Sequence, residues 1–477
     1  MQIVAVGALT LALSVPSCAP ELAPRRPNIV FVSIDSLRRD HVGCYGYGKA
    51  TTPVIDALAA DGVRFDSAVS TTSWTLPAHA AMFTGLYDST HGLYDNGLRL
   101  APEHATLAEQ LAANGYHTAG FYSGPYLHPT FGLGDGFEVY TSCMTAVDAG
   151  AGDEHVRSES RAPAGKSHDD VTGPRTVAEV TRWADQRPQD RPYFLFVHMW
   201  DVHYDFIPPP PYDTRFDPDY TGTLSGVDFM GNPAVNPQMA PRELEHLLAL
   251  YDGEIAFTDD NLGKLLDVLR ARGMLDNTLV VVTADHGEEF FEHFGKGHQK
   301  TLFDEVVRVP LVVSWPDRLA PAVVRDQVRT IDIAPLLLNA AGVTKLAPMQ
   351  GRDILPLARG EKLPAHAALC ELHADKQDQR ALRTNELKLY APGRTPMGVI
   401  APMGFDLVAD PRERAPLQAE RDARFLAATK EFESTNKAAA ALRDWLGARA
   451  RHVTLDPALE AKLRETGYLG DTPGAKK

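Results

Sequence analysis

Two carboxylates and a histidine stand where predicted strands end. Asp35 directly follows the apolar run 27–34 (PNIVFVSI), and Asp285 and His286 closely follow a second run, 278–283 (TLVVVT). A single carboxylate at the end of a strand is as often a helix cap or a salt-bridge partner as a ligand. Two such sites, one with an adjacent imidazole, can converge on one cation through oxygen and nitrogen ligands. The pattern therefore favours a metal centre.

A third polar stretch, 73–79 (SWTLPAH), runs straight into a helix that we predict to begin at Pro77. The N–H groups and the positive dipole end of that helix would point toward the Thr75 hydroxyl and hold an anionic sulfuryl or phosphoryl group there. A threonine hydroxyl is a weak nucleophile unless a metal or a base deprotonates it, which a cation on the two carboxylates would do. Taken alone, Thr75 also fits a capping residue two positions before a proline.

The elements that must position these residues alternate between strands and helices. Beyond the two runs above, strands are predicted at 117–122, 193–199 and 311–315, and helices at 53–60, 77–83, 105–113 and 242–272. Such alternation forms right-handed βαβ units around a mostly parallel sheet, and sites gather beyond the carboxyl ends of its strands. We expect 145–170 to be a surface loop and the proline-rich stretch 205–241 to be irregular and to cross the active face.

After about residue 365 the pattern changes. The stretches 381–390 and 403–408 predict short antiparallel strands, and 420–446 predicts a helix. We therefore expect an α/β fold with a mostly parallel central sheet flanked by helices in 25–365. A small α+β subdomain, an antiparallel sheet plus a helix, should follow in 366–477.

Size and charge exclude some classes of function. The chain has 477 residues, 44% of them hydrophobic, which suffices for one large core and a smaller appendage. Its net charge is −15 and no run of Lys or Arg occurs, so nucleic acid is excluded as a partner. Four cysteines, at positions 18, 44, 143 and 370, are too few for a disulfide scaffold.

Residues 1–24 are predicted to be an export signal. The apolar run 3–15 is too short to span a bilayer and ends in Val-Pro-Ser-Cys, which resembles a bacterial lipoprotein box with Cys18 as the acylated residue. The lack of Lys or Arg before the run and the presence of Pro16 argue against lipidation, so an ordinary cleaved signal and a misplaced start codon stay open. We expect a protein of the periplasm or cell envelope, attached to a membrane only through an N-terminal lipid.

The order of Asp35, Thr75 with its proline and helix, and Asp285-His286 resembles the sulfatase family of the alkaline phosphatase superfamily. The resemblance covers most of the mature chain and is carried by stretches at 28–38, 40–46, 84–92, 283–289, 302–310, 381–384 and 405–411. It implies an alkaline-phosphatase-like fold and a hydrolase of sulfuric or phosphoric esters. It also implies one divalent ion, Ca, Mn or Zn, held by Asp35, Asp285, His286 and the oxygen of the nucleophile, Thr75.

The resemblance implies further roles around this centre. His298 and His203 fall where relatives contact the leaving group or substrate, although both also fit structural histidines. We expect Asn96, His79 and Asp201 to contact the substrate. A second metal site built from Asp201, His203 and His298, as in the phosphatase branch, is less favoured, because that branch spaces the pair Asp-x-x-x-His and here it is Asp-x-His.

The chain departs from the family motif at several positions. Sulfatases proper carry a Cys or Ser that is oxidised to formylglycine, in the motif Cys/Ser-x-Pro-Ser-Arg; here the motif runs from Thr75 to His79, and threonine cannot form formylglycine. The usual Asp-Asp pair of ligands is Asp35-Ser36. The Lys and His that grip sulfate fall on Ser123 and Pro125. A threonine nucleophile is what phosphodiesterase, pyrophosphatase and phospho-headgroup transferase relatives use.

The residues thus favour metal-dependent hydrolysis of a sulfate ester or of a phosphate ester or diester, with a small-molecule, glycan-linked or lipid-linked substrate. The alternative is transfer of a phospho-headgroup to an envelope acceptor, which is less favoured because such transferases carry multi-span membrane domains. A non-enzymatic binding protein would have lost Asp35, Thr75 or Asp285, and all three are present. A serine hydrolase would need a G-x-S-x-G elbow, which does not occur. The sequence specifies no oligomeric state.

Overall fold

A computed structural model describes residues 26–144, 171–344, 347–374, 377–395, 398–417, 422–466 and 468–469. The predicted export signal with Cys18 and the predicted loop 145–170 lie outside the described residues. Within the described ranges, each helix is either too short or too polar to cross a membrane.

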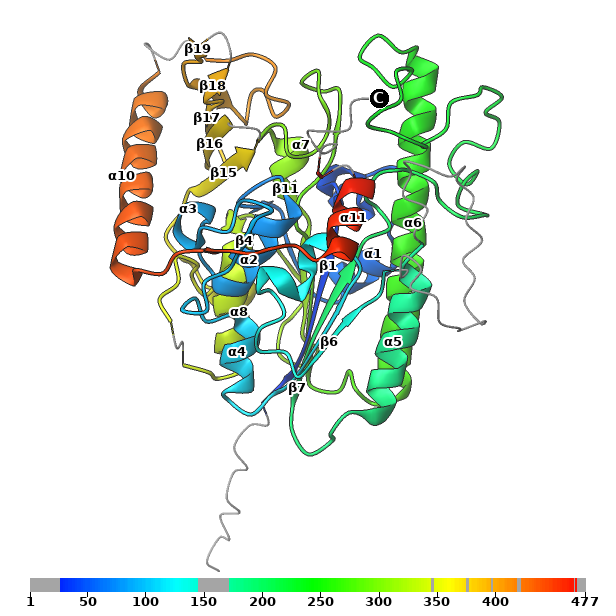
Figure 1. Ribbon diagram of the computed structural model, residues 1–477, viewed down its shortest axis with the longest axis vertical. Coiled ribbons are helices and arrows are strands. Elements are labelled where there is room, and N and C mark those ends of the chain that lie inside the picture. The colour runs from blue at the N-terminus through cyan, green and yellow to red at the C-terminus, as the bar shows by residue number, and fades with distance from the viewer. Residues whose placement is uncertain are drawn as a thin grey trace, which may run out of the picture.

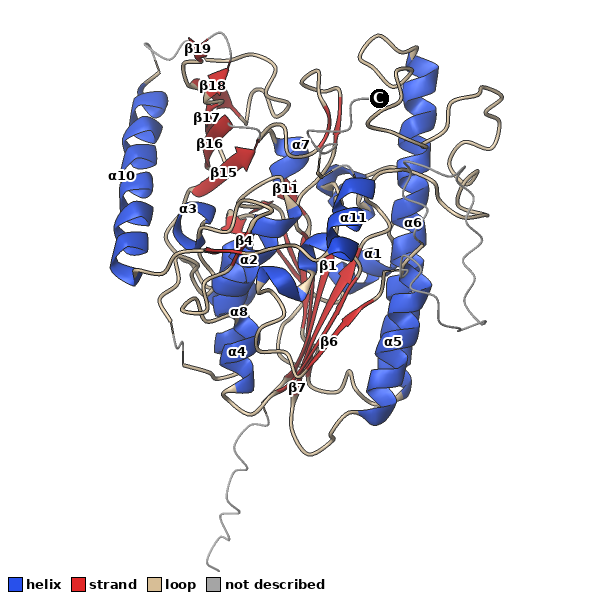
Figure 2. Cartoon of the chain, viewed as in Figure 1, coloured by secondary structure: helices blue, strands red, loops and turns tan. Residues whose placement is uncertain are grey.

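The centre of the molecule is a twisted sheet of eight strands (Figure 2). In spatial order these are β13 (Ala322–Val324), β2 (Val63–Phe65), β12 (Leu311–Ser314), β8 (Thr278–Ala284), β1 (Asn28–Ile34), β7 (Tyr193–Met199), β5 (His117–Tyr122) and β6 (Val139–Ser142). All neighbours run parallel except β12, which is antiparallel to both β8 and β2. The predicted α/β fold with a mostly parallel sheet is confirmed.

Helices cover both faces of this sheet (Figure 1). On one side lie α5 (Gly173–Gln186) and α6 (Pro241–Ala271), and on the other lie α2 (Thr75–Thr84), α4 (Leu107–Ala112) and α8 (Ile333–Ala340). The helix α1 (Pro53–Ala60) packs against α6 and β12. Because both faces are covered, the central strands are mostly apolar and almost entirely buried.

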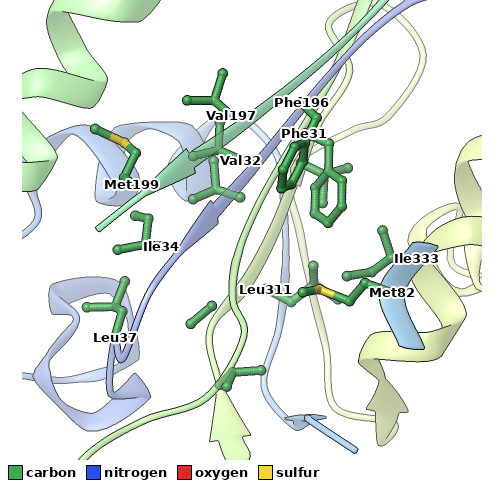
Figure 3. Packing of buried hydrophobic residues seen from close by; sticks show 14 of the residues in the cluster. Phe31, Val32, Ile34, Leu37, Met82, Phe196, Val197, Met199, Leu311 and Ile333 are labelled. Carbon is green, nitrogen blue, oxygen red and sulfur yellow. The ribbon is translucent and has the colours of Figure 1, made fainter. Parts of the chain in front are cut away.

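Alternation along the central strands decides which residues face which helices. Figure 3 shows Phe31 of β1 and Phe196 of β7 on the side of Met82 and Ile333, while the next residue of each strand points the other way. Since successive side chains of a strand alternate between faces, positions 33 and 198 share the face of Phe31 and Phe196. That face looks toward α2.

Two predicted boundaries are wrong. The helix predicted from Pro77 begins at Thr75, because proline is tolerated within the first helical turn, where its missing N–H would have no acceptor. The stretch 381–390 is a hairpin rather than one strand: β16 (Gln377–Arg383) and β17 (Leu387–Ala391) flank a turn in which the Thr384 hydroxyl accepts N–H groups from residues 386 and 387.

The C-terminal part forms the predicted α+β subdomain. Its antiparallel sheet runs β15 (Ala368–Ala374), β16, β17 and β20 (Met403–Asp406), with α10 (Ala423–Leu446) packed against it. The stretch 205–241 is irregular apart from an isolated bridge, as predicted. The remaining short strands and α-helices are β3 (Ala68–Val69), α3 (Asp88–His91), β4 (Leu98–Arg99), β9 (Glu289–Phe290), β10 (Lys296–Gly297), α7 (Asp304–Val307), β11 (Arg308–Val309), β14 (Val328–Arg329), α9 (Leu355–Ala358), β18 (Arg394–Thr395), β19 (Gly398–Val399), β21 (Arg451–His452) and α11 (Pro457–Glu465).

Candidate active site

The ends of two neighbouring strands bring Asp35 and Asp285 together. β1 and β8 are parallel and their last paired residues are Ile34 and Ala284, so both aspartates leave the sheet at the same edge, fully buried. Ser36 lies between them with a left-handed backbone (φ 54°). Its hydroxyl donates to Asp35 Oδ1 at 2.8 Å and its N–H donates to Asp285 Oδ1 at 3.2 Å. Ser36 therefore engages one oxygen of each carboxylate and leaves the two Oδ2 atoms for other partners.

Thr75 lies beside this pair as the first residue of α2. Its hydroxyl oxygen is 3.4 Å from Asp35 Oδ2 and 3.2 Å from His286 Nε2. The first helical hydrogen bond of α2 runs from the N–H of Ala78 to the carbonyl of Trp74 at 3.1 Å. The N–H groups before it have no intrahelical acceptor, so donors and the positive end of the helix dipole lie next to the Thr75 hydroxyl. An anion could be held at this point.

The residues of this cluster fit a divalent ion. Ligand atoms of Asp35, Asp285 and His286 lie within 4.8 Å of one another. Asp285 Oδ2 is buried and has no hydrogen-bond partner among the residues that the structure describes. Burial raises the pKa of Asp35 to about 6, and burial together with the neighbouring Asp35 raises the pKa of Asp285. Two buried carboxylates that repel each other are stabilised by a cation between them.

Two further histidines lie at the edge of the cluster. The ring of His298 is 4.4 Å from that of His286, and its Nδ1 is 3.3 Å from the carboxylate oxygens of Glu288. The ring of His203 follows at 4.9 Å from His298. The hydroxyl of Tyr468 lies 2.5 Å from His203 Nε2 and 3.3 Å from His298 Nε2. The structure thus gathers both predicted leaving-group histidines near Thr75.

His79 lies next to the backbone of Thr75. Its Nδ1 is 2.8 Å from the carbonyl oxygen of Thr75, and its Nε2 is 3.0 Å from the hydroxyl of Ser33. The side chain is fully buried, and burial lowers the pKa of His79 to about 3. The neutral ring therefore donates from Nδ1 and accepts at Nε2, which positions Thr75. The substrate contact predicted for His79 stays a prediction.

The other two predicted substrate residues lie farther from the carboxylates in the hydrogen-bond network. Asn96 donates from Nδ2 to the carbonyl oxygen of Tyr468 at 3.3 Å, at the edge formed by the C-terminal segment. Asp201 accepts the N–H and the hydroxyl of Thr172, at 2.6 and 3.2 Å, at the start of α5. Their contacts with a substrate stay predictions.

Sequence reasoning missed three residues here. His198 is buried in β7, and its Nε2 lies 3.3 Å from Asp35 Oδ2; the signal was a single histidine in the otherwise apolar run 193–199. Glu288 follows the Asp285-His286 pair and contacts His298, and its position in a row of acidic residues offered a weak signal. Tyr468 comes from the segment after α11, and nothing in its sequence surroundings indicates a role.

The chain contributes little fixed positive charge to the cluster. Burial lowers the pKa of His198 to about 4, and burial followed by repulsion from Asp35 raises that of Glu288 well above its ordinary value. The His198 side chain is therefore neutral near pH 7. Among the described residues, neither Asp35 nor Asp285 forms an ion pair with a Lys or Arg. A divalent ion would balance the two aspartates.

Comparisons with known proteins agree with this arrangement. The model of the sulfatase family matches residues 27–343, and that of the C-terminal part of N-sulphoglucosamine sulphohydrolase matches residues 292–424. The chain is 28% identical to an ulvan-active sulfatase of Formosa agariphila over 443 residues, which cover 87% of this chain and 83% of that protein.

Solved structures share the fold. One, a protein in complex with its substrate D-glucosamine-2-N,6-O-disulfate, superposes with a TM-score of 0.70 at 19% identity and covers 87% of this chain and 98% of that one. Another, the phosphonate monoester hydrolase of Agrobacterium radiobacter, has a TM-score of 0.68 at 23% identity and covers 88% of this chain and 96% of that one.

Proposed function

The chain belongs to the sulfatase family and is a hydrolase acting on ester bonds, and we propose that it cleaves a singly charged ester through Thr75, with a divalent ion at Asp35, Asp285 and His286. The observation that carries the proposal is the position of the Thr75 hydroxyl, 3.4 Å from Asp35 Oδ2 and 3.2 Å from His286 Nε2 at the start of α2. A divalent ion bound there would lower the pKa of this hydroxyl and screen the charge of the substrate.

The charge of the site supports a monoanionic substrate. Two ionised aspartates and a divalent ion sum to no net charge, and the neutral His79 stands where the family motif carries an arginine. The remaining attraction comes from the N-terminus of α2, which favours one negative charge more readily than two. Sulfate monoesters, phosphate diesters and phosphonate monoesters all carry a single charge.

The nucleophile favours phosphorus over sulfur among these. Thr75 cannot form the gem-diol through which sulfatases expel sulfate, so a sulfated Thr75 would have to be hydrolysed directly. Phosphorus in a covalent intermediate tolerates attack by water. We therefore propose phosphate diesters and related monoanionic phosphorus esters as the substrates, with the fold of the sulfatase family retained.

The proposed reaction then consists of two displacements at phosphorus. Thr75 loses its hydroxyl proton to solvent water and its oxygen attacks phosphorus. The bond from phosphorus to the leaving alcohol breaks as the oxygen of that alcohol takes a proton from His298. Glu288, 3.3 Å from His298 Nδ1, orients that ring so that Nε2 faces the reaction. Water then attacks the same phosphorus and gives a proton to the neutral His298, and Thr75 leaves as an alkoxide that regains its proton from solvent water.

A substrate panel on wild-type and variant protein tests the proposal. Aryl sulfate, phosphate monoester, phosphate diester and phosphonate monoester are compared for turnover, and products are analysed for an acceptor-linked group, which would indicate transfer rather than hydrolysis. Thr75→Ala should abolish turnover and Thr75→Ser should retain part of it. Thr84→Ala, which removes a buried hydroxyl at the other end of α2, serves as the control.

Two results would contradict the proposal. A wild-type protein that turns over aryl sulfate far faster than any phosphorus ester would overturn the choice of substrate. Full activity in Thr75→Ala would remove the nucleophile.

A further inference from the structure

We propose that His198 is a ligand of the divalent ion, in place of the second carboxylate that the family motif would carry at Ser36, and that it makes the site select zinc over calcium. The inference rests on the proposed function only in placing one divalent ion beside Thr75. It concerns a residue of the central sheet that neither the motif nor the reaction above uses.

The position of His198 in β7 places its side chain next to the cluster of Asp35, Asp285 and His286. β1 and β7 are parallel with Ser33 opposite His198, and both residues share the face that looks toward α2. The imidazole is completely buried, and neither ring nitrogen makes a hydrogen bond among the described residues. Its Nε2 lies 3.3 Å from Asp35 Oδ2. A buried imidazole without a hydrogen bond is costly unless something else binds it.

Ser36 is occupied in a different way. Its hydroxyl and its N–H donate to the Oδ1 atoms of Asp35 and Asp285, and the N–H of His286 also donates to Asp285 Oδ1 at 2.8 Å. Outer hydrogen bonds of this kind orient ligands rather than bind the ion. Ser36 therefore fixes the carboxylates, and one coordination position is left for another residue.

The distances around the cluster resemble the edges of a coordination polyhedron. Asp35 Oδ2 lies 3.4 Å from the Thr75 oxygen and 3.3 Å from His198 Nε2. His286 Nε2 lies 3.2 Å from the Thr75 oxygen and 3.5 Å from Asp285 Oδ2. Neighbouring ligands bound to zinc at about 2.0–2.2 Å, with angles of about 90–110° at the ion, are separated by about 2.8–3.6 Å. His198 thus lies at the separation from Asp35 Oδ2 that is expected of two ligands of one ion.

His79 is the rival imidazole. Ligand atoms of His79, His198 and Asp285 also lie within 4.8 Å of one another. However, both ring nitrogens of His79 are engaged, one by the Thr75 carbonyl and the other by the Ser33 hydroxyl. Binding an ion through His79 would break the hydrogen bond that positions Thr75. His198 can bind without such a loss.

A second imidazole changes which ion is preferred. Calcium takes six to eight oxygen ligands, whereas imidazole nitrogen suits zinc and related transition metals. With His198, the set becomes two imidazoles, two carboxylates and one hydroxyl. This composition and the short separations both disfavour calcium.

Binding of Zn²⁺ and of Ca²⁺ to chelator-treated full-length protein tests the inference, measured by calorimetry on four proteins. They are the wild type, His198→Leu, the double variant His198→Leu with Ser36→Asp, and the control His117→Leu. His117 is a buried histidine at the amino-terminal end of β5. Asp35 and Asp285 follow the carboxyl-terminal ends of their strands, so His117 lies at the other end of the parallel sheet.

The wild type should bind one Zn²⁺ and prefer it to Ca²⁺. His198→Leu should weaken Zn²⁺ binding by more than about 100-fold, since loss of an outer partner alone costs about 10- to 100-fold. The double variant should recover binding with the preference shifted toward Ca²⁺, and His117→Leu should bind as the wild type does. In Cu²⁺-loaded wild type, which needs no variant to fold, pulsed electron paramagnetic resonance should detect two imidazoles.

Unchanged Zn²⁺ affinity in His198→Leu, or one imidazole in the spectrum, would overturn the inference while the ion and the proposed function stand. A wild type that prefers Ca²⁺ would do the same. If Zn²⁺ binding depends on His198 but Thr75→Ala stays active, the proposed function fails and the ligand assignment holds. If the wild type binds neither ion, both fail.

Discussion

Replacing His79 separates a positioning role from a substrate contact. The buried ring makes two hydrogen bonds, of 2.8 Å to the Thr75 carbonyl and 3.0 Å to the Ser33 hydroxyl. In His79→Ala the Thr75 carbonyl and the Ser33 hydroxyl stay buried without their hydrogen bonds to the ring. Each unpaired group lowers the free energy of unfolding by about 1–3 kcal/mol, and the cavity left by the ring lowers it further. We expect the free energy of unfolding to fall by about 4 kcal/mol. His79→Asn, whose amide can donate from the place of Nδ1, should lose only about half as much.

The same change should act on catalysis through Thr75. Without its tether the first residue of α2 can shift, and a displacement of about 1 Å at a reacting group costs about 100-fold in rate. We therefore expect kcat to fall about 100-fold in His79→Ala and less in His79→Asn, with KM little changed. Urea unfolding and steady-state kinetics on a phosphate diester measure both quantities. A raised KM with unchanged unfolding free energy would refute the positioning role and support a direct substrate contact.

Two further outcomes follow from buried charges. Arg383 binds Asp304 through two nitrogens at 2.9 and 2.8 Å and joins the C-terminal sheet to the catalytic part, so Arg383→Met should lower the free energy of unfolding, measured with urea, by about 3–5 kcal/mol. The side chain of Arg380 is 27% exposed, so the control Arg380→Met should lower it by less than about 1 kcal/mol. Equal losses in the two variants would contradict this expectation. Because burial raises the pKa of Asp35 to about 6 in the metal-free protein, protons should compete with the ion below that pH, and Zn²⁺ affinity should fall about tenfold per unit between pH 6 and pH 5. Equal affinity at pH 5 and pH 7 would show that Asp35 is not a ligand.

The sequence predicted those parts of the site that local patterns determine. Asp35 and Asp285 could be paired because each follows an apolar run, and parallel strands end at one edge of the sheet. Thr75 could be placed because a proline marks the start of a helix, although the helix begins two residues earlier. Hydrophobic patterns likewise gave the central strands and the long helix α6, because burial on both faces leaves a continuous apolar run in the sequence and burial on one face leaves a periodic one.

What the sequence could not give depends on contacts between distant segments. His198 lies next to Asp35 because it is paired with Ser33 across β1 and β7. The register between two strands cannot be predicted from the sequence of either strand alone. Tyr468 reaches His203 and His298 from 265 and 170 residues away in the chain. A contact of that range follows from how α11 packs, not from any local pattern.

The departures from the family motif at positions 36 and 79 are explained together if His198 binds the ion. An arginine at position 79 would bring a buried positive charge to within about the 5.0 Å that separates the rings of His79 and His198, where it would repel a cation bound by His198. A second aspartate at position 36 would compete with that imidazole for the same coordination position. The neutral His79 removes the repulsion, and Ser36 turns from a ligand into a donor that orients Asp35 and Asp285. Each of the three residues is therefore consistent with the other two, and a threonine nucleophile, which depends on the ion for its activation, is consistent with all of them.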